Sequence, residues 1–116
     1  MKTTLLIAGL ALVLAACGGA TTSCDFRNGS VNGPEPRCQE WQNSIVGPTG
    51  TYKTTCGLAQ GVYRDSECPR DGIVAGCEQN ANNADGSKVI DWYYAPKTAD
   101  TVMTECKSPS TFHAKP

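Results

Sequence analysis

Cysteine is the residue type in this sequence with the most chemistry to offer. The chain has seven cysteines, but it has no C-x2-C pair, and His113 is its only histidine. Zinc sites need closely spaced cysteines or histidines, so this spacing disfavours a metal. Common disulfide oxidoreductases use C-x-x-C, whereas Cys68 and Cys77, the closest pair here, are separated by eight residues. We therefore expect structural disulfides and no metal or cofactor.

The carboxylates and the histidine make a weaker case for catalysis. Asp65, Glu67 and Asp71 lie close in sequence, and a glycosidase needs two carboxylates at a fixed separation. Charges on strands and turns are more often solvated, and His113 lies three residues from the end, where we expect a solvated tail. The sequence lacks G-x-S-x-G, H-E-x-x-H and a phosphate-binding glycine loop. We predict no catalytic residues and no enzyme activity.

Trp92, Tyr93 and Tyr94 are the candidate binding surface. Exposed aromatic side chains are typical anchors for protein or glycan contacts. Because neighbouring side chains of a strand point to opposite faces, Tyr93 must face away from Trp92 and Tyr94. One set packs in the core, and the other is either a binding surface or, as we favour, packed against a helix at 98–106.

The regular elements that must position these residues are mainly strands. Alternating apolar residues, bounded by turn residues, predict an antiparallel sheet of three to four strands. The predicted strands are 61–67, 73–77, 88–95 and a short closing strand at 111–114. The stretch 18–37 is rich in Asn, Gly and Pro and is expected to be a loop.

One or two short helices complete the predicted α+β fold, a small disulfide-rich domain. Thr98 is the expected N-cap of the clearest helix, with Asp100 in its first turn and Val102, Met103 and Cys106 on one face. A short helical piece is expected at 37–44, and a weaker one at 52–58 because its threonines are poor helix formers.

The sequence contains a weak internal repeat. Thr54-Thr55-Cys56 is followed after seven residues by Tyr63, and Thr104-Glu105-Cys106 after six residues by Phe112. Each unit reads as a cysteine at the end of a helix, then a turn, then an aromatic strand residue. Two units are too few for a stacked repeat, so we expect at most a pseudo-duplication.

Composition bounds the class of protein. The 116 residues are 40% hydrophobic and 18% charged, with 10 Lys and Arg against 11 Asp and Glu. The chain is too apolar for a disordered protein, and its balanced charge excludes the basic patch that nucleic-acid binders need. Its length fits one small domain, which we expect to be a monomer.

The N-terminus predicts export and a lipid anchor. Lys2 and the apolar run from Leu5 to Leu14 are typical of a signal peptide, and the run is shorter than the roughly 20 residues of a membrane-spanning helix. Leu14-Ala15-Ala16-Cys17 resembles the lipobox of bacterial lipoproteins. The resemblance implies removal of residues 1–16 and lipidation, palmitate included, of Cys17. The alternative is an ordinary signal peptide cut near Ala16 or Ala20.

The lipobox resemblance also implies a location. The inner-membrane retention signal of enteric bacteria is Asp after the lipidated cysteine, and Gly18 stands there. We therefore expect lipid anchoring in the cell envelope, with the outer membrane favoured over the inner. Residues 17–23 form the lipidated cysteine and a short tether, which reaches at most about 20 Å.

The single domain is expected to span residues 24–116. With Cys17 lipidated, an even number of cysteines remains in a short exported chain, which predicts three disulfides. Six cysteines allow 15 pairings, and the sequence does not choose among them. The six are Cys24, Cys38, Cys56, Cys68, Cys77 and Cys106.

The mature part resembles small, uncharacterised cysteine-rich lipoproteins of myxobacterial type. The residues that carry the resemblance are Cys68-Pro69, Val74-Ala75-Gly76-Cys77, Trp92-Tyr93-Tyr94 and Cys106. It covers roughly residues 38–113 and implies the fold, without an activity. Those relatives usually have a leucine- and alanine-rich helix before the middle cysteine, where this chain has Gly47-Pro48-Thr49-Gly50.

Taken together, these features predict a membrane-anchored lipoprotein that acts as a non-catalytic binding or structural module at the cell envelope, facing the periplasm or the surface. Its expected partners are the membrane, through the lipid, and an envelope protein or glycan. The alternative is an inhibitor of a hydrolase, a protease or lysozyme, presented at the outer membrane with a preorganised loop at 28–36 or 79–87. A small envelope hydrolase ranks third.

Overall fold

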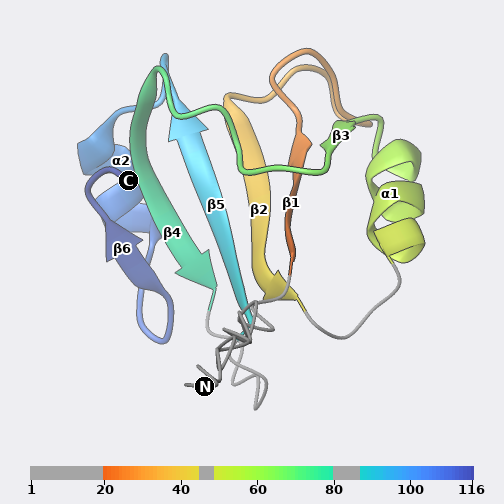
Figure 1. The fold of residues 1–116 in the computed structure, drawn as a ribbon. Coiled ribbons are helices and arrows are strands. Elements are labelled where there is room, and N and C mark those ends of the chain that lie inside the picture. Colours follow the sequence, from red (N-terminus) through yellow and green to blue (C-terminus); the bar gives the residue numbers. More distant parts are fainter. Residues whose placement is uncertain (1–19, 45–48, 80–86) are drawn as a thin grey trace, which may run out of the picture.

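A single antiparallel sheet with two helices on one of its faces forms the domain (Figure 1). The computed structural model describes residues 20–44, 49–79 and 87–116. The predicted signal peptide, Cys17 and most of the loop at 79–87 lie outside the described residues. Within the described part there are six strands and two helices: β1 (Ala20–Asp25), β2 (Arg37–Ser44), α1 (Thr49–Leu58), β3 (Val62–Arg64), β4 (Ile73–Gln79), β5 (Lys88–Tyr94), α2 (Ala99–Glu105) and β6 (Thr111–His113).

The order of the strands reveals two equivalent halves. Along the sheet the strands run β3-β1-β2-β5-β4-β6, and every described pairing is antiparallel. Along the chain each half has the order strand, strand, helix, strand: β1-β2-α1-β3, then β4-β5-α2-β6. The two halves join at β2 and β5, so the sheet has an approximate twofold axis at its centre. The weak internal repeat in the sequence therefore corresponds to a structural pseudo-duplication.

Disulfides mark equivalent places in the two halves. Cys24 of β1 bonds to Cys56 of α1, and Cys77 of β4 bonds to Cys106 at the end of α2. The residue opposite the strand cysteine is aromatic in both edge strands, Tyr63 opposite Cys24 and Phe112 opposite Cys77. Since both strand cysteines occupy the same face of the sheet, both helices lie on that face.

The third disulfide holds the opposite face. Cys38 of β2 bonds to Cys68 in the connection between β3 and β4, which crosses the sheet in front of β1, β2 and β5 in Figure 1. Beneath this connection lies one buried cluster, Cys38, Cys68, Ile73, Ile90, Trp92 and Tyr94. A second buried cluster lies under α1 and contains Cys24, Phe26, Trp41 and Cys56. The predicted three disulfides are thus present, and each ties the sheet to a covering segment.

Several predicted elements are confirmed. The helix at 52–58 forms as α1, and Thr98 caps α2 by accepting a hydrogen bond from the Thr101 N–H at 3.2 Å. The strands predicted at 61–67, 73–77, 88–95 and 111–114 correspond to β3, β4, β5 and β6. The small disulfide-rich α+β domain is therefore confirmed, but the expected three to four strands are too few for the described sheet.

Three predictions are wrong for one reason, which is that β1 and β2 were not foreseen. Residues 37–44 form a strand instead of a helix, because Cys38 and Glu40 point to one face and Trp41 to the other. Residues 20–23 are not a tether, since Thr22 and Ser23 are buried in β1. The domain therefore includes residues before 24, and the turn-rich segment shortens to 26–36.

Two side chains differ from the prediction near the C-terminus. Met103 does not share the buried face of α2, for it is 54% exposed while Val102 is buried. His113 is not in a frayed tail, because it lies in β6 with its Nε2 3.0 Å from Oε1 of Glu78. This pair occupies the same place in the second half as the Arg64–Asp25 ion pair in the first.

Candidate functional site

The connection between β1 and β2, residues 26–36, is the candidate binding loop. Its tip is a tight turn in which the Gly33 N–H donates to the Ser30 carbonyl at 3.0 Å. Gly33 has a φ of 92°, which favours glycine at this position. The Ser30 hydroxyl donates to the Gly33 carbonyl at 2.6 Å and accepts from the Asn32 N–H at 3.1 Å. These bonds close the tip on itself, so its shape does not depend on a partner.

Further hydrogen bonds fix the loop to the domain. The Phe26 carbonyl accepts from the N–H groups of Gly29 and Glu35, at 3.2 and 3.0 Å, which closes the base of the loop. The Val31 N–H donates to the carbonyl of Ala59, at the end of α1, at 3.1 Å. Because Phe26 is buried in the cluster under α1, the loop is anchored in the core at its base and on the helix at its tip.

Exposed aliphatic side chains gather beside this loop. Val31 is 60% exposed, Leu58 76% and Val62 47%. Val31 is hydrogen-bonded to Ala59, the residue after Leu58. Val62 stands opposite Asp25, so its side chain points to the face of the sheet away from Cys24 and α1. We call Val31 and Leu58 the loop-end patch. The loop follows the end of β1 and lies at the end of the sheet opposite Ala20, the first residue of that strand (Figure 1).

A shallow pocket of about 290 Å³ flanks the loop on the side of β5. Its wall is mainly proline with one acidic and one basic residue: Arg27, Pro34, Glu35, Pro36, Ala95 and Pro96. The Arg27 guanidinium lies 4.2 Å from the centre of the Tyr94 ring, a cation–π contact that holds the basic wall in place. Proline walls lose little conformational freedom on binding, so this pocket is also preorganised.

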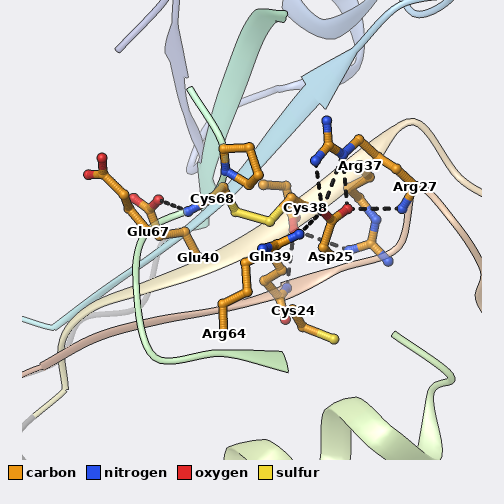
Figure 2. The surroundings of a disulfide bond; sticks show 12 residues. Cys24, Asp25, Arg27, Arg37, Cys38, Gln39, Glu40, Arg64, Glu67 and Cys68 are labelled. Atoms are coloured by element: carbon orange, nitrogen blue, oxygen red, sulfur yellow. Dashed lines mark hydrogen bonds and ion pairs between the residues drawn. A yellow bond between two sulfur atoms is a disulfide. The ribbon is translucent and has the colours of Figure 1, made fainter. Parts of the chain in front are cut away.

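A buried carboxylate supports the base of the loop. Asp25 is 2% exposed and accepts hydrogen bonds from Arg27, from the backbone N–H at 3.0 Å and from the guanidinium Nε and Nη2 at 2.8 to 3.2 Å, with Arg64 3.5 Å away (Figure 2). Burial alone would raise the pKa of Asp25, but the hydrogen bonds and charge of Arg27 outweigh it and keep the pKa below its usual 3.8. The carboxylate is therefore a fixed anion at neutral pH.

Two more carboxylates, which sequence analysis did not single out, are buried in the sheet. Glu40 is fully buried, and its carboxylate accepts from the Cys68 N–H at 2.8 Å (Figure 2). It also pairs with Arg70 at 3.1 Å. Asp91 accepts from side chains of Arg37, Gln39 and Gln79 at 3.0 to 3.1 Å. For Asp91, its position among the apolar residues of β5 was the available signal, whereas the mixed sequence of β2 gave none for Glu40. Each is saturated by donors, which is typical of a structural role.

The predicted aromatic surface is largely internal. Trp92 and Tyr94 are 3% and 5% exposed and belong to the core under the crossing connection. Tyr93 faces the other way, as the alternation predicted, and is half-buried beside Val102 and Cys106 of the α2 region. Trp92 and Tyr94 are therefore core side chains, and Tyr93 alone of the three has partial access to solvent.

The carboxylates considered for catalysis do not converge on one point. Asp65 accepts a hydrogen bond from the Tyr63 hydroxyl at 2.8 Å, and Glu67 pairs with Arg70 at 2.9 Å. Asp71 is exposed at the turn before β4. All three residues are exposed on the connection between β3 and β4.

The described residues hold neither a cluster of metal ligands nor a membrane-spanning helix. No group of three or more His, Cys, Asp or Glu side chains in that part of the chain could hold a metal ion. No described helix is long and apolar enough to cross a membrane.

Comparison with known proteins identifies no relative. No protein-family model matches the chain, no curated protein matches it, and no solved structure resembles it at a significant level.

Proposed function

We propose that the protein is a lipid-anchored, non-catalytic binding module of the bacterial envelope, and that the loop 26–36 with the loop-end patch is its contact surface. The observation that carries this proposal is the loop itself. Its shape is fixed by internal hydrogen bonds, yet Val31 at its tip is 60% exposed. An exposed apolar side chain on a preorganised loop binds without an ordering cost, which favours recognition.

The position of the loop relative to the proposed anchor supports this role. Only Gly18 and Gly19 separate Cys17 from Ala20, where β1 begins. A six-residue strand at roughly 3.3 Å per residue is about 20 Å long, and the loop follows its far end. Acyl chains on Cys17 would therefore hold one end of the sheet at the bilayer and present the loop-end patch away from it.

The three disulfides support an extracytoplasmic location. Disulfides form and persist in oxidising compartments, and the periplasm and cell surface are such places. Gly18 after the proposed lipidated cysteine favours the outer membrane over the inner.

The anchor is tested by the intact mass of the protein extracted from membranes. We expect the mass of the chain from Cys17 onward plus acyl groups, and loss of membrane association in Cys17→Ser. A mature chain that begins elsewhere, or that carries no lipid, would overturn the anchoring proposal.

The contact surface is tested by a photo-crosslinking residue placed at Val31 in living cells. A crosslinker at Met103, which is 54% exposed on α2, is the matched control. We expect an envelope protein or glycan to be captured from position 31 and not from 103, and the capture to be lost in Leu58→Asp. Equal capture from both positions would contradict a role for the loop.

A second candidate function, inhibition of a hydrolase, is favoured by the same rigid loop. Residues 30–33 form a turn and not an extended segment, so the loop would plug a cleft instead of mimicking a substrate. An inhibitor should abolish the activity of its protease or lysozyme at an equimolar ratio, and Val31→Asp should relieve the block. Residual activity at saturation would exclude this version for the hydrolase tested.

A further inference from the structure

The disulfides differ in their access to solvent. Cys24 and Cys56 are each 1% exposed, and Cys38 and Cys68 are fully buried. Cys77 and Cys106 are both half-buried, and they line a small pocket of about 50 Å³ together with Tyr93, Val102 and Glu105. A thiolate must reach a sulfur atom to exchange with it, so access separates this disulfide from the other two.

The first half of the fold shows how the equivalent disulfide is sealed. Cys24–Cys56 lies in a cluster with Phe26 and Trp41, and Gly61 passes directly over it. A Cβ atom at Gly61 would lie 2.4 Å from the Cys24 sulfur and 3.1 Å from the Cys56 sulfur. The backbone itself therefore closes off that disulfide.

The second half offers less cover. Cys106 follows the seven-residue helix α2, in which Val102 is the one buried residue. The pocket reaches the disulfide between this helix and β4, the strand that carries Cys77. The difference in access therefore comes from the segments that cover the two disulfides, since the disulfides hold equivalent places in the fold.

We propose that Cys77–Cys106 is a site of thiol–disulfide exchange with an extracytoplasmic dithiol. One thiolate of the dithiol attacks the sulfur of Cys106, the Cys77–Cys106 bond breaks, and its electron pair leaves on the sulfur of Cys77. The second thiolate of the dithiol then attacks the mixed disulfide and releases Cys106. The dithiol becomes a disulfide, and its two electrons and two protons pass to Cys77 and Cys106.

The location of the two sulfur atoms sets the direction of attack. Cys77 lies within β4 and is flanked by β5 and β6, so strands limit the approach to its sulfur. Cys106 lies where α2 ends and the connection to β6 begins, so a reagent can approach it from the helix end. Cys106 is therefore the sulfur attacked and Cys77 the leaving group.

Reduction loosens a defined segment. Without the disulfide, α2 is held by the buried Val102, and β6 by a three-residue pairing with β4 and the His113–Glu78 contact. Few buried contacts and short pairings are typical of segments that open locally. The C-terminal segment 99–113 then exchanges between docked and open states while the other two disulfides hold the rest of the sheet.

The test is graded reduction of the full chain under native conditions with dithiothreitol, followed by acid quench, alkylation and peptide mapping. We expect alkylation of Cys77 and Cys106 at a dithiothreitol concentration at least tenfold below that needed to label the four cysteines of the other two disulfides. Simultaneous labelling of all six disulfide cysteines, or earlier labelling of Cys24 or Cys38, would overturn the proposal.

A second measurement identifies the source of the dithiol. Thioredoxin whose resolving cysteine is changed to serine is incubated with the oxidised protein, and a mixed disulfide at Cys106 is expected. Capture at Cys106 supports exchange with a protein dithiol, whereas reaction with dithiothreitol alone supports a small-molecule dithiol. The double variant Cys77→Ser with Cys106→Ser should form neither product, and capture at any other cysteine would contradict the assignment.

Discussion

The side-chain amide of Gln39 donates to Oδ1 of Asp91 at 3.1 Å across the central pair of strands, β2 and β5. In the first half of the fold Gln39 stands opposite Cys24, and in the second half Asp91 stands opposite Cys77. The two residues are therefore structural equivalents, and the approximate twofold axis of the sheet passes between them. The halves meet through a pair of equivalent residues that hydrogen-bond to each other.

Equivalent positions in the two halves make the same kind of interaction but carry different side chains. The Arg64–Asp25 ion pair joins the edge strand β3 to β1, and the His113–Glu78 pair joins β6 to β4. Each half pairs a basic residue of its edge strand with an acidic residue of the next strand. A duplicated unit explains this arrangement, and the exchange of side chains explains why the repeat is faint in the sequence.

Replacing Asp91 tests the joint between the halves. Asp91→Ala leaves the amides of Gln39 and Gln79 without their shared acceptor, and Arg37 loses one of its two ion pairs and keeps the one with Glu35. Hydrogen bonds to a charged group contribute about 1.5–3 kcal/mol, and we expect a loss of this order in the free energy of unfolding. Urea denaturation measures it, with the exposed Asp71→Ala as the control. Equal stability of the two variants would contradict a role for Asp91 at the joint.

The sequence predicts the segments whose signals are local, and it does not predict those that depend on distant partners. The strands β4 and β5 and the helix α2 were predicted because apolar alternation and the Thr98 cap are local signals. The strand β2 was missed because its sequence, RCQEWQNS, places a buried charge at Glu40 where an apolar residue is expected. Only the partners Arg70 and the Cys68 N–H, about thirty residues away, make that burial tolerable.

The candidate binding loop was foreseen in position but not in structure. Its Asn, Gly and Pro residues predicted an irregular segment, and 28–36 was one of the two loops proposed for an inhibitor. The hydrogen bond from the Val31 N–H to the Ala59 carbonyl joins residues that are distant in sequence, so no local sequence pattern predicts it. The sequence left open whether the aromatic triplet is exposed, because exposure depends on the crossing connection at 65–72, which covers Trp92 and Tyr94.

The close packing of Trp92 on β4 makes Gly76 irreplaceable. A Cβ atom at Gly76 would lie 2.5 Å from the indole of Trp92, a rigid ring that is itself buried. We expect Gly76→Ala to cost about 1–3 kcal/mol of stability, as overpacking does. Gly57 in α1 has open space around its Cα, so Gly57→Ala should raise stability by about 0.5–1 kcal/mol. Thermal unfolding of the two variants should shift in opposite directions, and a parallel shift would refute the packing argument.

The ion pair between Asp25 and Arg27 at the base of the loop makes the stability of the fold depend on pH in the acidic range. Because the folded-state pKa of Asp25 lies below its usual 3.8, its contribution is complete above the unfolded-state pKa and is lost as the pH falls through the folded-state value. The free energy of unfolding should therefore decline below about pH 4. In Arg27→Gln the main stabilising donor is gone, so the decline should begin at a higher pH. An unchanged acid limb in Arg27→Gln would contradict this assignment, which denaturation at a series of pH values can measure.

The buried phenol of Tyr94 makes the stability of the fold depend on pH in the alkaline range. Burial raises its pKa from 10 to about 12, since the nearby Arg27 offsets only part of the desolvation of a phenolate. The folded state thus favours the neutral phenol, and its contribution to stability is complete below pH 10 and is lost as the pH rises toward about 12. Tyrosinate absorbance of the native protein should show Tyr94 among the last of the four tyrosines to ionise. Tyr94→Phe should remove this late step and, by breaking the hydrogen bond to the Pro69 carbonyl, lower stability at neutral pH by about 1 kcal/mol. A late ionisation step that persists in Tyr94→Phe would assign the raised pKa to another tyrosine.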